Sequence, residues 1–239
     1  MNGAQQLKFR DTTAHNMPKL HHFTLDPYSR RIRLSLAEKG ETVTLVDERP
    51  WSPSQVLRAH NPSGLLPVLV EEQGTAICGV EALGEYLEER DDAKSLLPGN
   101  AVARAEIRRL VAWFDVKFYT EVSEPLLTEK VVKRFMQGST APDMARVRAA
   151  LQNLKPHLDY LAWLVEERSW LAGEELTLAD LAAAAHLSAI DYIGDIKWAE
   201  VPVAKSWYQR IKSRPSFRGL LGDTVAGKPP SASYADLDF

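Results

Sequence analysis

The spacing of hydrophobic residues divides the chain into two parts. In the first part, short apolar runs alternate with amphipathic runs, which predicts strands and helices in turn. Strands are expected at 19–25, at 42–48 and, as a hairpin around a Gln-Gly turn, at 67–79. Helices are expected at 30–39, 52–60 and 80–90, with Ser29 as the N-cap of the first one. The order β-α-β-α-β-β-α predicts a compact α/β unit.

The second part shows only helical periodicity. A polar linker with Pro and Gly near its end, residues 91–100, precedes it. Apolar residues then recur at threes and fours, which predicts helices at 101–119, 125–136, 147–164, 176–193 and 201–214. Thr177 and Asp180 have the spacing of an N-terminal capping box. This part therefore predicts an all-helical domain.

Composition narrows the class of protein. Of the 239 residues, 45% are hydrophobic and 26% are charged, which is typical of a globular protein. The net charge of −3 gives no basic field that would attract nucleic acid. Cys78 is the single cysteine, so no internal disulfide can form, and a reducing cytoplasm is expected. No apolar run approaches the roughly 18 residues of a membrane span, so direct membrane insertion is not expected.

Two further features of the sequence limit the search for a site. The leader 1–16 lacks the apolar region of a secretory signal; we expect it to be disordered and exclude it from the fold. The six histidines show no metal-ligand spacing, so no metal site is predicted.

Three motifs in register carry a family resemblance. The stretches NPSGLLPVL (61–69), LAGEELTLAD (171–180) and RIKSRPSF (210–217) resemble motifs of the glutathione transferase superfamily. The resemblance extends over about residues 19–220. It implies an α/β thioredoxin-like domain at 17–90 and an all-α domain at 101–220, in a homodimer. It also implies a cis peptide bond between Leu66 and Pro67.

The resemblance implies glutathione chemistry, but this sequence lacks the group that the chemistry needs at the start of the first helix. The family holds the glutathione thiolate with a donated hydrogen bond from Ser or Tyr, or replaces it with a Cys. That position falls on Asp26, and an ionised carboxylate donates no hydrogen bond and repels a thiolate. Tyr28 and Ser29 are nearby donors, but Ser29 also fits a helix cap and Tyr28 a packing residue. Cys78 is expected to be an inert strand residue.

The second half of the family's glutathione site is altered as well. The family binds the γ-glutamyl end with a Glu-Ser pair, and these positions fall on Gly79 and Val80, with Glu81 adding repulsion. We therefore expect no glutathione cofactor and no catalytic residue. The altered site comprises Asp26, Tyr28, Ser29, Leu66, Pro67, Gly79, Val80 and Glu81.

The C-terminal tail, residues 221–239, is the last segment to interpret. Its Gly and Pro residues predict an extended path, so few of its residues should belong to the core. Its apolar end either folds back on its own domain or binds a partner as a short motif. Deleting 232–239 is expected to leave folding unchanged. The candidates for partner contact are Trp51, Lys130, Lys133, Arg134, Tyr234, Asp236, Leu237, Asp238 and Phe239.

A closer resemblance suggests the partner. WFDVKF (113–118), EKVVKRF (129–135) and YADLDF (234–239) resemble a branch of the superfamily in alphaproteobacteria. That branch contains a cell-division protein that binds FtsZ. The resemblance implies a non-catalytic homodimer that regulates FtsZ filaments at the division site. Two alternatives stay open: a glutathione-dependent transferase that uses Tyr28 or Ser29, and an adaptor for another partner, like the stringent-starvation type.

Overall fold

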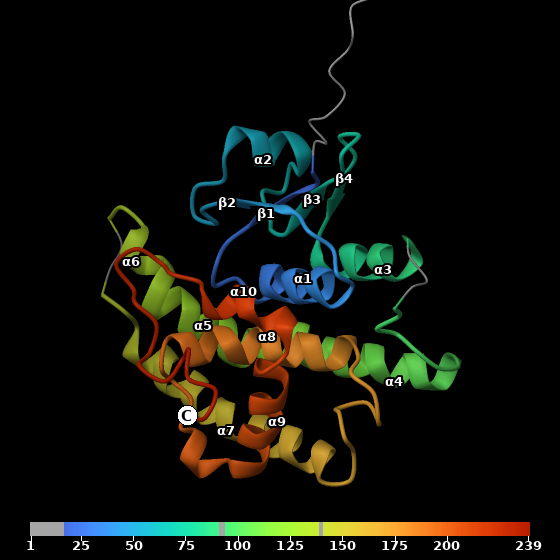
Figure 1. The fold of residues 1–239 in the computed structure, drawn as a ribbon. Coiled ribbons are helices and arrows are strands. Elements are labelled where there is room, and N and C mark those ends of the chain that lie inside the picture. The colour runs from blue at the N-terminus through green and yellow to red at the C-terminus, as the bar shows by residue number, and fades with distance from the viewer. Residues whose placement is uncertain (1–16, 91–93, 139–140) are drawn as a thin grey trace, which may run out of the picture.

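The structure is a computed structural model that describes residues 17–90, 94–138 and 141–239. The expected leader and the start of the expected linker lie outside these residues. Four strands form one mixed sheet in the order β2-β1-β3-β4 (Figure 1). They are β1 (Lys19–His22), β2 (Thr44–Asp47), β3 (Val68–Val70) and β4 (Ala76–Cys78). β1 is parallel to β2 and antiparallel to β3, which is antiparallel to β4.

Three helices cover this sheet. Helices α1 (Pro27–Glu38) and α3 (Val80–Arg90) lie on the face toward the helical part, and α2 (Gln55–His60) lies on the other face (Figure 1). Ile32 and Leu36 of α1 pack on the sheet, whereas Leu34 joins the core of the helical part. Helix α1 therefore connects two apolar cores. The predicted α/β unit is confirmed.

The start of α1 differs from the prediction. The helix begins at Pro27, and Asp26 rather than Ser29 is its N-cap, accepting a hydrogen bond from the amide of Ser29 at 2.8 Å. Asp is a strong N-cap residue, and Pro is favoured in the first helical position because that position needs no amide hydrogen. The prediction of Ser29 as N-cap was wrong because Asp-Pro supplies both signals three residues earlier.

The helical part begins with one long helical stretch. It runs through α4 (Ala101–Ala112), the π-helical η1 (Trp113–Ser123), α5 (Glu124–Leu127), the π-helical η2 (Thr128–Val132) and α6 (Lys133–Phe135). The break expected between 119 and 125 is absent. Pro125 lies inside this stretch, two residues after the end of the π-helical η1, so the helical path continues through a residue that has no amide hydrogen to donate. π-Helical turns often lie at functional sites, and η1 is the segment that faces α1 through Tyr28 and Arg31.

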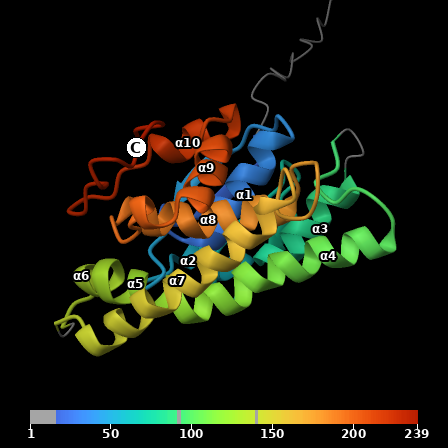
Figure 2. The same ribbon diagram turned by 90° about the horizontal axis from the view of Figure 1, so that it is seen from below.

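The remaining helices of the described residues follow α6 along the chain. They are α7 (Met144–Glu166), α8 (Leu178–Tyr192), η3 (Trp198–Glu200), α9 (Pro202–Lys212), η4 (Pro215–Phe217) and α10 (Arg218–Leu221). Every residue of α8 is buried, and the helix contacts α1, α4, η1 and α9 (Figure 2). The predicted capping box at its start is confirmed: the Thr177 side chain accepts from Ala179, and Asp180 accepts from the Thr177 amide. No helix of the described residues is long and apolar enough to cross a membrane.

Few tail residues belong to the core, as predicted: of residues 221–239 only Tyr234 is buried, but this residue anchors the tail to its own chain. Tyr234 is fully buried; its hydroxyl accepts a hydrogen bond from Arg30 at 2.9 Å and donates one to the Leu220 carbonyl. The Phe239 ring lies 3.9 Å from the ammonium of Lys212. Hydrogen bonds and cation–π contacts, rather than a helix, thus hold this extended segment on its own chain.

Candidate functional site

The hydroxyl groups at the start of α1 are both engaged within the protein. Ser29 is buried and donates to the Asp26 carboxylate, with 2.6 Å between the oxygens. Tyr28 donates to the backbone carbonyl of Asp115 at 2.7 Å. A hydroxyl has one hydrogen to donate. Neither group therefore offers a donor to a thiolate without breaking a bond of the fold, so the alternative chemistry through Tyr28 or Ser29 gains no support here.

Asp26 is a half-buried carboxylate with a perturbed pKa. Burial raises its pKa to about 6, hydrogen bonds from Ser29 and from the Tyr28 amide oppose the rise, and the charge of Asp115 adds to it. Asp26 forms no ion pair with any residue in the described part of the chain. At pH 7 the site thus holds a negative charge at the position where the family stabilises a thiolate, which raises rather than lowers a thiol pKa.

The other half of the family's glutathione site keeps its backbone but not its side chains. The Leu66–Pro67 peptide bond is cis, as predicted. The amide of Gly79 donates to the Pro67 carbonyl at 3.1 Å, and Gly79 has a φ of 90°, a conformation that favours glycine over other residues. Val80 packs on the core of the sheet domain, and Glu81 is exposed. No side chain that could bind an α-carboxylate stands at these positions.

A buried polar network lies beneath the start of α1. The carboxylate of Asp115 in η1 binds the guanidinium of Arg31 and lies 3.2 Å from His186 Nε2. The other ring nitrogen of His186 lies 2.8 Å from the hydroxyl oxygen of Ser123. Burial raises the pKa of Asp115, but Arg31 and His186 together bring it below its usual value.

This network joins the two domains and is not an active site. Ser, His and Asp are the residue types of a hydrolase triad. However, Ser123 and His186 are both fully buried, so no substrate reaches the Ser123 oxygen. Arg31 comes from the sheet domain and its partner Asp115 from the helical domain. The network therefore fixes how α1 sits on η1 and α8.

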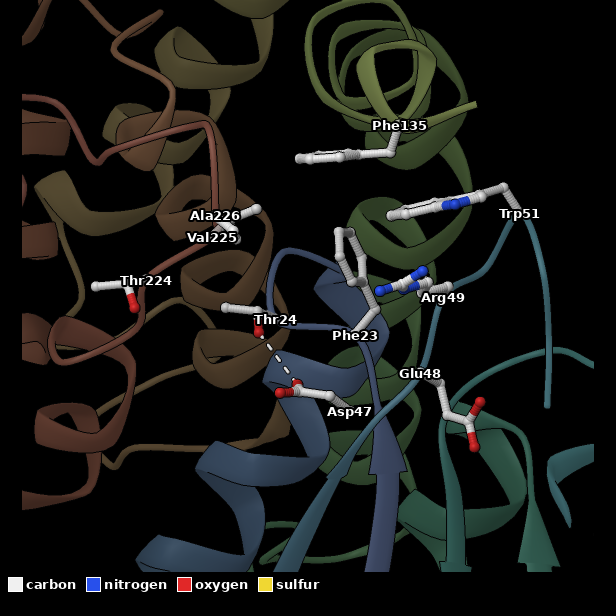
Figure 3. A pocket seen from close by; sticks show the side chains of 10 residues that line it. All are labelled: Phe23, Thr24, Asp47, Glu48, Arg49, Trp51, Phe135, Thr224, Val225 and Ala226. Atoms are coloured by element: carbon white, nitrogen blue, oxygen red, sulfur yellow. Dashed lines mark hydrogen bonds between the residues drawn. The ribbon is translucent and has the colours of Figure 1, made fainter. Parts of the chain in front are cut away.

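Two adjoining cavities share the side chains of Phe23 and Trp51. The larger, of about 380 Å³, lies between the ends of β1 and β2, α6 and the start of the tail (Figure 3). Trp51 stacks on Phe135 with ring centroids 5.3 Å apart, and Phe23 meets Trp51 edge-on at 5.5 Å. Phe23 and Trp51 thus contribute to the walls of both cavities, and Phe135 to the larger one.

The smaller cavity, of about 280 Å³, opens at the start of α1. Its lining is mostly apolar and aromatic: Phe23, Leu25, Asp26, Pro27, Pro50, Trp51, Tyr119, Glu124, Leu127, Thr128, Val132 and Met136. Of the predicted site residues, the structure thus brings Asp26 and Trp51 together on one cavity. Gly79, Val80 and Glu81 do not line either cavity.

The predicted partner-contact residues have different environments. Lys130 pairs with Asp195, and Lys133 pairs with Glu129, whereas Arg134 is exposed. In the tail, Asp236, Leu237 and Asp238 are exposed.

Two tail residues are less accessible than the sequence suggested. Phe239 is half-buried, and Tyr234 is buried and has no surface for a partner. Tyr234 is therefore withdrawn from the candidates.

Several residues that build this region were not predicted from the sequence. Arg30, Asp115 and His186 are buried. Arg30 and Asp115 bond across the domains, His186 holds Asp115 within the helical domain, and Phe135 forms a wall of the larger cavity. One signal existed: RRIR carries three cations on a helix expected to pack against a sheet, so their charges required partners. The positions of those partners came only from the fold.

Comparisons with known proteins agree with this geometry. The model of the glutathione S-transferase N-terminal domain matches residues 27–90, and that of the C-terminal domain matches residues 125–215. FtsZ-localized protein A of Caulobacter vibrioides is 46% identical over 92% of this chain and 97% of its own.

Solved structures give the same result. A glutathione S-transferase from Rhodospirillum rubrum F11 is 50% identical with a TM-score of 0.90, and FzlA from C. crescentus is 46% identical with a TM-score of 0.90. Each alignment covers 93% of this chain and 100% of the other. Together with the thioredoxin-like sheet, the helical domain and the cis-proline loop, these matches show that this chain belongs to the glutathione S-transferase family.

Proposed function

We propose that this chain binds FtsZ filaments as a non-catalytic protein with the glutathione S-transferase fold, in the cytoplasm at the division site. The observation that carries the proposal is the similarity to FtsZ-localized protein A, which is 46% identical over 223 residues. The alignment includes both the sheet domain and the helical domain. A partner surface built on this fold is therefore expected to be shared between the two proteins.

The altered glutathione site supports a binding function over an enzymatic one. Asp26 replaces a hydrogen-bond donor with an acceptor, and Val80 offers no hydroxyl to the γ-glutamyl carboxylate. A hydrogen bond to a charged group contributes roughly 1.5–3 kcal/mol. The family's Glu and Ser each contact glutathione at the positions of Gly79 and Val80. The absence of both contacts is expected to weaken glutathione binding by about two to four decades.

A homodimer is part of the proposal, and an exposed aromatic face supports it. On α7, Trp163 is 61% exposed and stacks on Tyr160, which in turn packs on Trp113 of η1. Val116 of η1 is 57% exposed. Large exposed apolar residues that cluster on one face mark interaction surfaces. A dimer presents two copies of any FtsZ-binding surface, so it can bridge filament subunits and gain avidity.

Substitution of Trp163 tests the dimer. Trp163→Glu places a charge on the aromatic face without touching the core. We expect light scattering after size exclusion to give twice the chain mass for the wild type and a single chain mass for the variant. A measured mass of 26.7 kDa for the wild type, the mass of a single chain, would reject the dimer but not FtsZ binding.

Co-sedimentation with FtsZ and GTP tests the partner. We expect the wild type to pellet with filaments. Asp236→Lys should pellet less, because Asp236 is exposed and a lysine reverses the charge that a positive partner surface would meet. Glu72→Lys, a charge reversal at an exposed position between β3 and β4, is the matched control and should pellet like the wild type.

Each result of this experiment has a defined meaning. A wild type that stays in the supernatant overturns the proposal. Equal pelleting of wild type and Asp236→Lys removes the role of Asp236 alone. A pull-down from cytoplasmic extract then tests the adaptor alternative, which gains support if another protein is enriched and FtsZ is not.

A further inference from the structure

The smaller cavity combines apolar walls with one carboxylate that has no ion-pair partner among the described residues. Trp51, Tyr119 and Leu127 form part of its wall, and the Asp26 carboxylate lies at the start of α1. One carboxylate oxygen of Asp26 accepts both hydrogen bonds from Ser29. No Lys, Arg or His in the described residues forms an ion pair with Asp26.

Glu124, the other acidic residue of this cavity, has an ion-pair partner, unlike Asp26. Glu124 binds the guanidinium of Arg146 and accepts a hydrogen bond from Thr128 at 3.0 Å. Its charge is therefore balanced inside the protein. A carboxylate in an apolar surrounding is unfavourable unless it is paired, so Asp26 is the group in this cavity whose environment improves when a cation binds.

We propose that this cavity binds a small organic amine, with its ammonium group on Asp26 and its apolar body against Trp51 and Tyr119. Aromatic faces attract cations, so the rings favour the same ligand as the carboxylate does. Anions such as thiolates and carboxylates meet the charge of Asp26 and are disfavoured. The volume of about 280 Å³ lies just below the usual range of ligand pockets, about 300–1,000 Å³, so an amine with a single ring is the expected size.

The titratable groups around Asp26 influence how amine binding depends on pH. Asp115 and Tyr119 face it from η1, and Tyr28 faces it from its own helix. Asp115 is held by Arg31 and His186, as described above.

The ionised form of Asp26 is the one that binds an ammonium group. Because burial raises the pKa of Asp26 to about 6, affinity should rise as the pH rises through 6 and then level off. Between pH 7.5 and pH 5 the ionised fraction falls about tenfold, so the dissociation constant should increase by about the same factor.

Three probes of nearly equal shape separate charge from hydrophobic burial. These are 2-phenylethylamine, the neutral 2-phenylethanol and the anionic phenylacetate, each titrated by calorimetry at pH 7.5 with Trp fluorescence as a second signal. We expect saturable binding of the amine, with a dissociation constant at least tenfold lower than that of either analogue. Equal binding of the alcohol, or no saturable binding of the amine, would overturn the proposal.

Asp26→Asn tests the assigned carboxylate. Asn caps helices as well as Asp does, so α1 is retained while the charge is removed. We expect at least tenfold weaker amine binding and no change in affinity between pH 5 and pH 7.5. Asp47→Asn is the matched control, because Asp47 lines the larger cavity only, and it should bind the amine like the wild type.

The result for Asp26→Asn decides the assignment in either direction. Amine binding as tight as in the wild type would overturn the role of Asp26. If the variant does not fold, the wild-type comparison of the amine with the alcohol at the two pH values still decides. The outcome is independent of FtsZ co-sedimentation, which uses no amine.

Discussion

Helix α1 carries two polar regions that lie side by side and are built in opposite ways. In the middle of the helix every cation has a counter-charge: Arg30 and Arg33 bind Asp223, and Arg31 binds Asp115. At the start of the helix, Asp26 has no ion pair within the described residues. The cations connect α1 to the helical domain and the tail, whereas Asp26 borders a cavity.

This difference shows how the fold persists while the site changes. The ion pairs of Arg30, Arg31 and Arg33 join residues 84 to 193 positions apart along the sequence, so they hold the two domains together. The contacts of Asp26 stay within the first turn of its own helix. A substitution at Asp26 therefore alters the chemistry of the cleft and leaves the domain contacts intact.

Removing Asp115 is expected to cause one of the two largest losses of stability. Asp115→Ala leaves the buried Arg31 without a counter-charge, which destabilises by about 3–5 kcal/mol. Urea unfolding at pH 7 measures the loss. Asp159→Ala is the control, because its pair with Lys155 is exposed and contributes about 0–1 kcal/mol. A loss no larger than that of the control would show that the network does not join the domains.

Truncating Tyr234 should be comparably severe. Tyr234→Ala empties a fully buried ring position, and large-to-small changes of aromatic residues cost about 3–5 kcal/mol. Tyr234→Phe keeps the ring but deprives Arg30 of an acceptor, which costs about 1–3 kcal/mol. Leu237→Ala, at an exposed position, should stay within about 0.5 kcal/mol. Unchanged unfolding midpoints for Tyr234→Ala would restore the idea of a free tail.

The pH dependence of stability distinguishes Asp26 from the paired acids. The folded pKa of about 6 lies above the ordinary value of 3.8, so the folded state binds more protons than the unfolded state between these values. Asp26 thus makes unfolding easier as the pH rises from 4 to 6. The free energy of unfolding of Asp26→Asn relative to the wild type should increase by about 2–3 kcal/mol from pH 3.5 to pH 7.

The difference between the two proteins removes the contributions of other groups. His22, with a pKa of about 4, and Glu38, with a pKa of about 2, titrate in both proteins alike. Urea unfolding of both proteins at four pH values measures the difference in free energy of unfolding as a function of pH. A difference that is constant with pH would mean that Asp26 titrates at its ordinary pKa and is not perturbed by burial.

The smallest expected effect concerns Tyr28. Tyr28→Phe removes the hydrogen bond to the Asp115 carbonyl and should cost about 1 kcal/mol, again measured by urea unfolding. It should not change any activity with glutathione and a model electrophile such as chlorodinitrobenzene. A wild-type activity that disappears in Tyr28→Phe would instead support the transferase alternative.

Local signals in the sequence predicted much of the fold and part of the site. The capping box at Thr177 and Asp180 depends on neighbouring residues, and the cis bond at Pro67 was implied by the resemblance of its loop to a motif of the family; both predictions are confirmed. The loss of the family's side chains at Gly79 and Val80 was identified from the same resemblance. These are features that a short window of sequence contains.

Contacts between residues far apart in the sequence could not be predicted. The Gly and Pro content of the tail predicted a loosely packed segment. The sequence does not indicate that Tyr234 bonds to Arg30, which lies 204 positions away. The pairing of Asp115 with Arg31 and His186 could not be inferred, since nothing in the local pattern indicates which cation faces which acid. The cavity at Asp26 likewise exists only once η1 and the loop of Trp51 meet.

The central claim is that the start of α1 and the start of α3 no longer hold glutathione. Calorimetric titration of the full chain with millimolar glutathione at pH 7 tests it most directly, because binding is measured without any assumption about a second substrate. The account predicts no saturable heat. A dissociation constant below about 0.1 mM, roughly −5.5 kcal/mol, would contradict it and would make this chain a glutathione-binding member of its family.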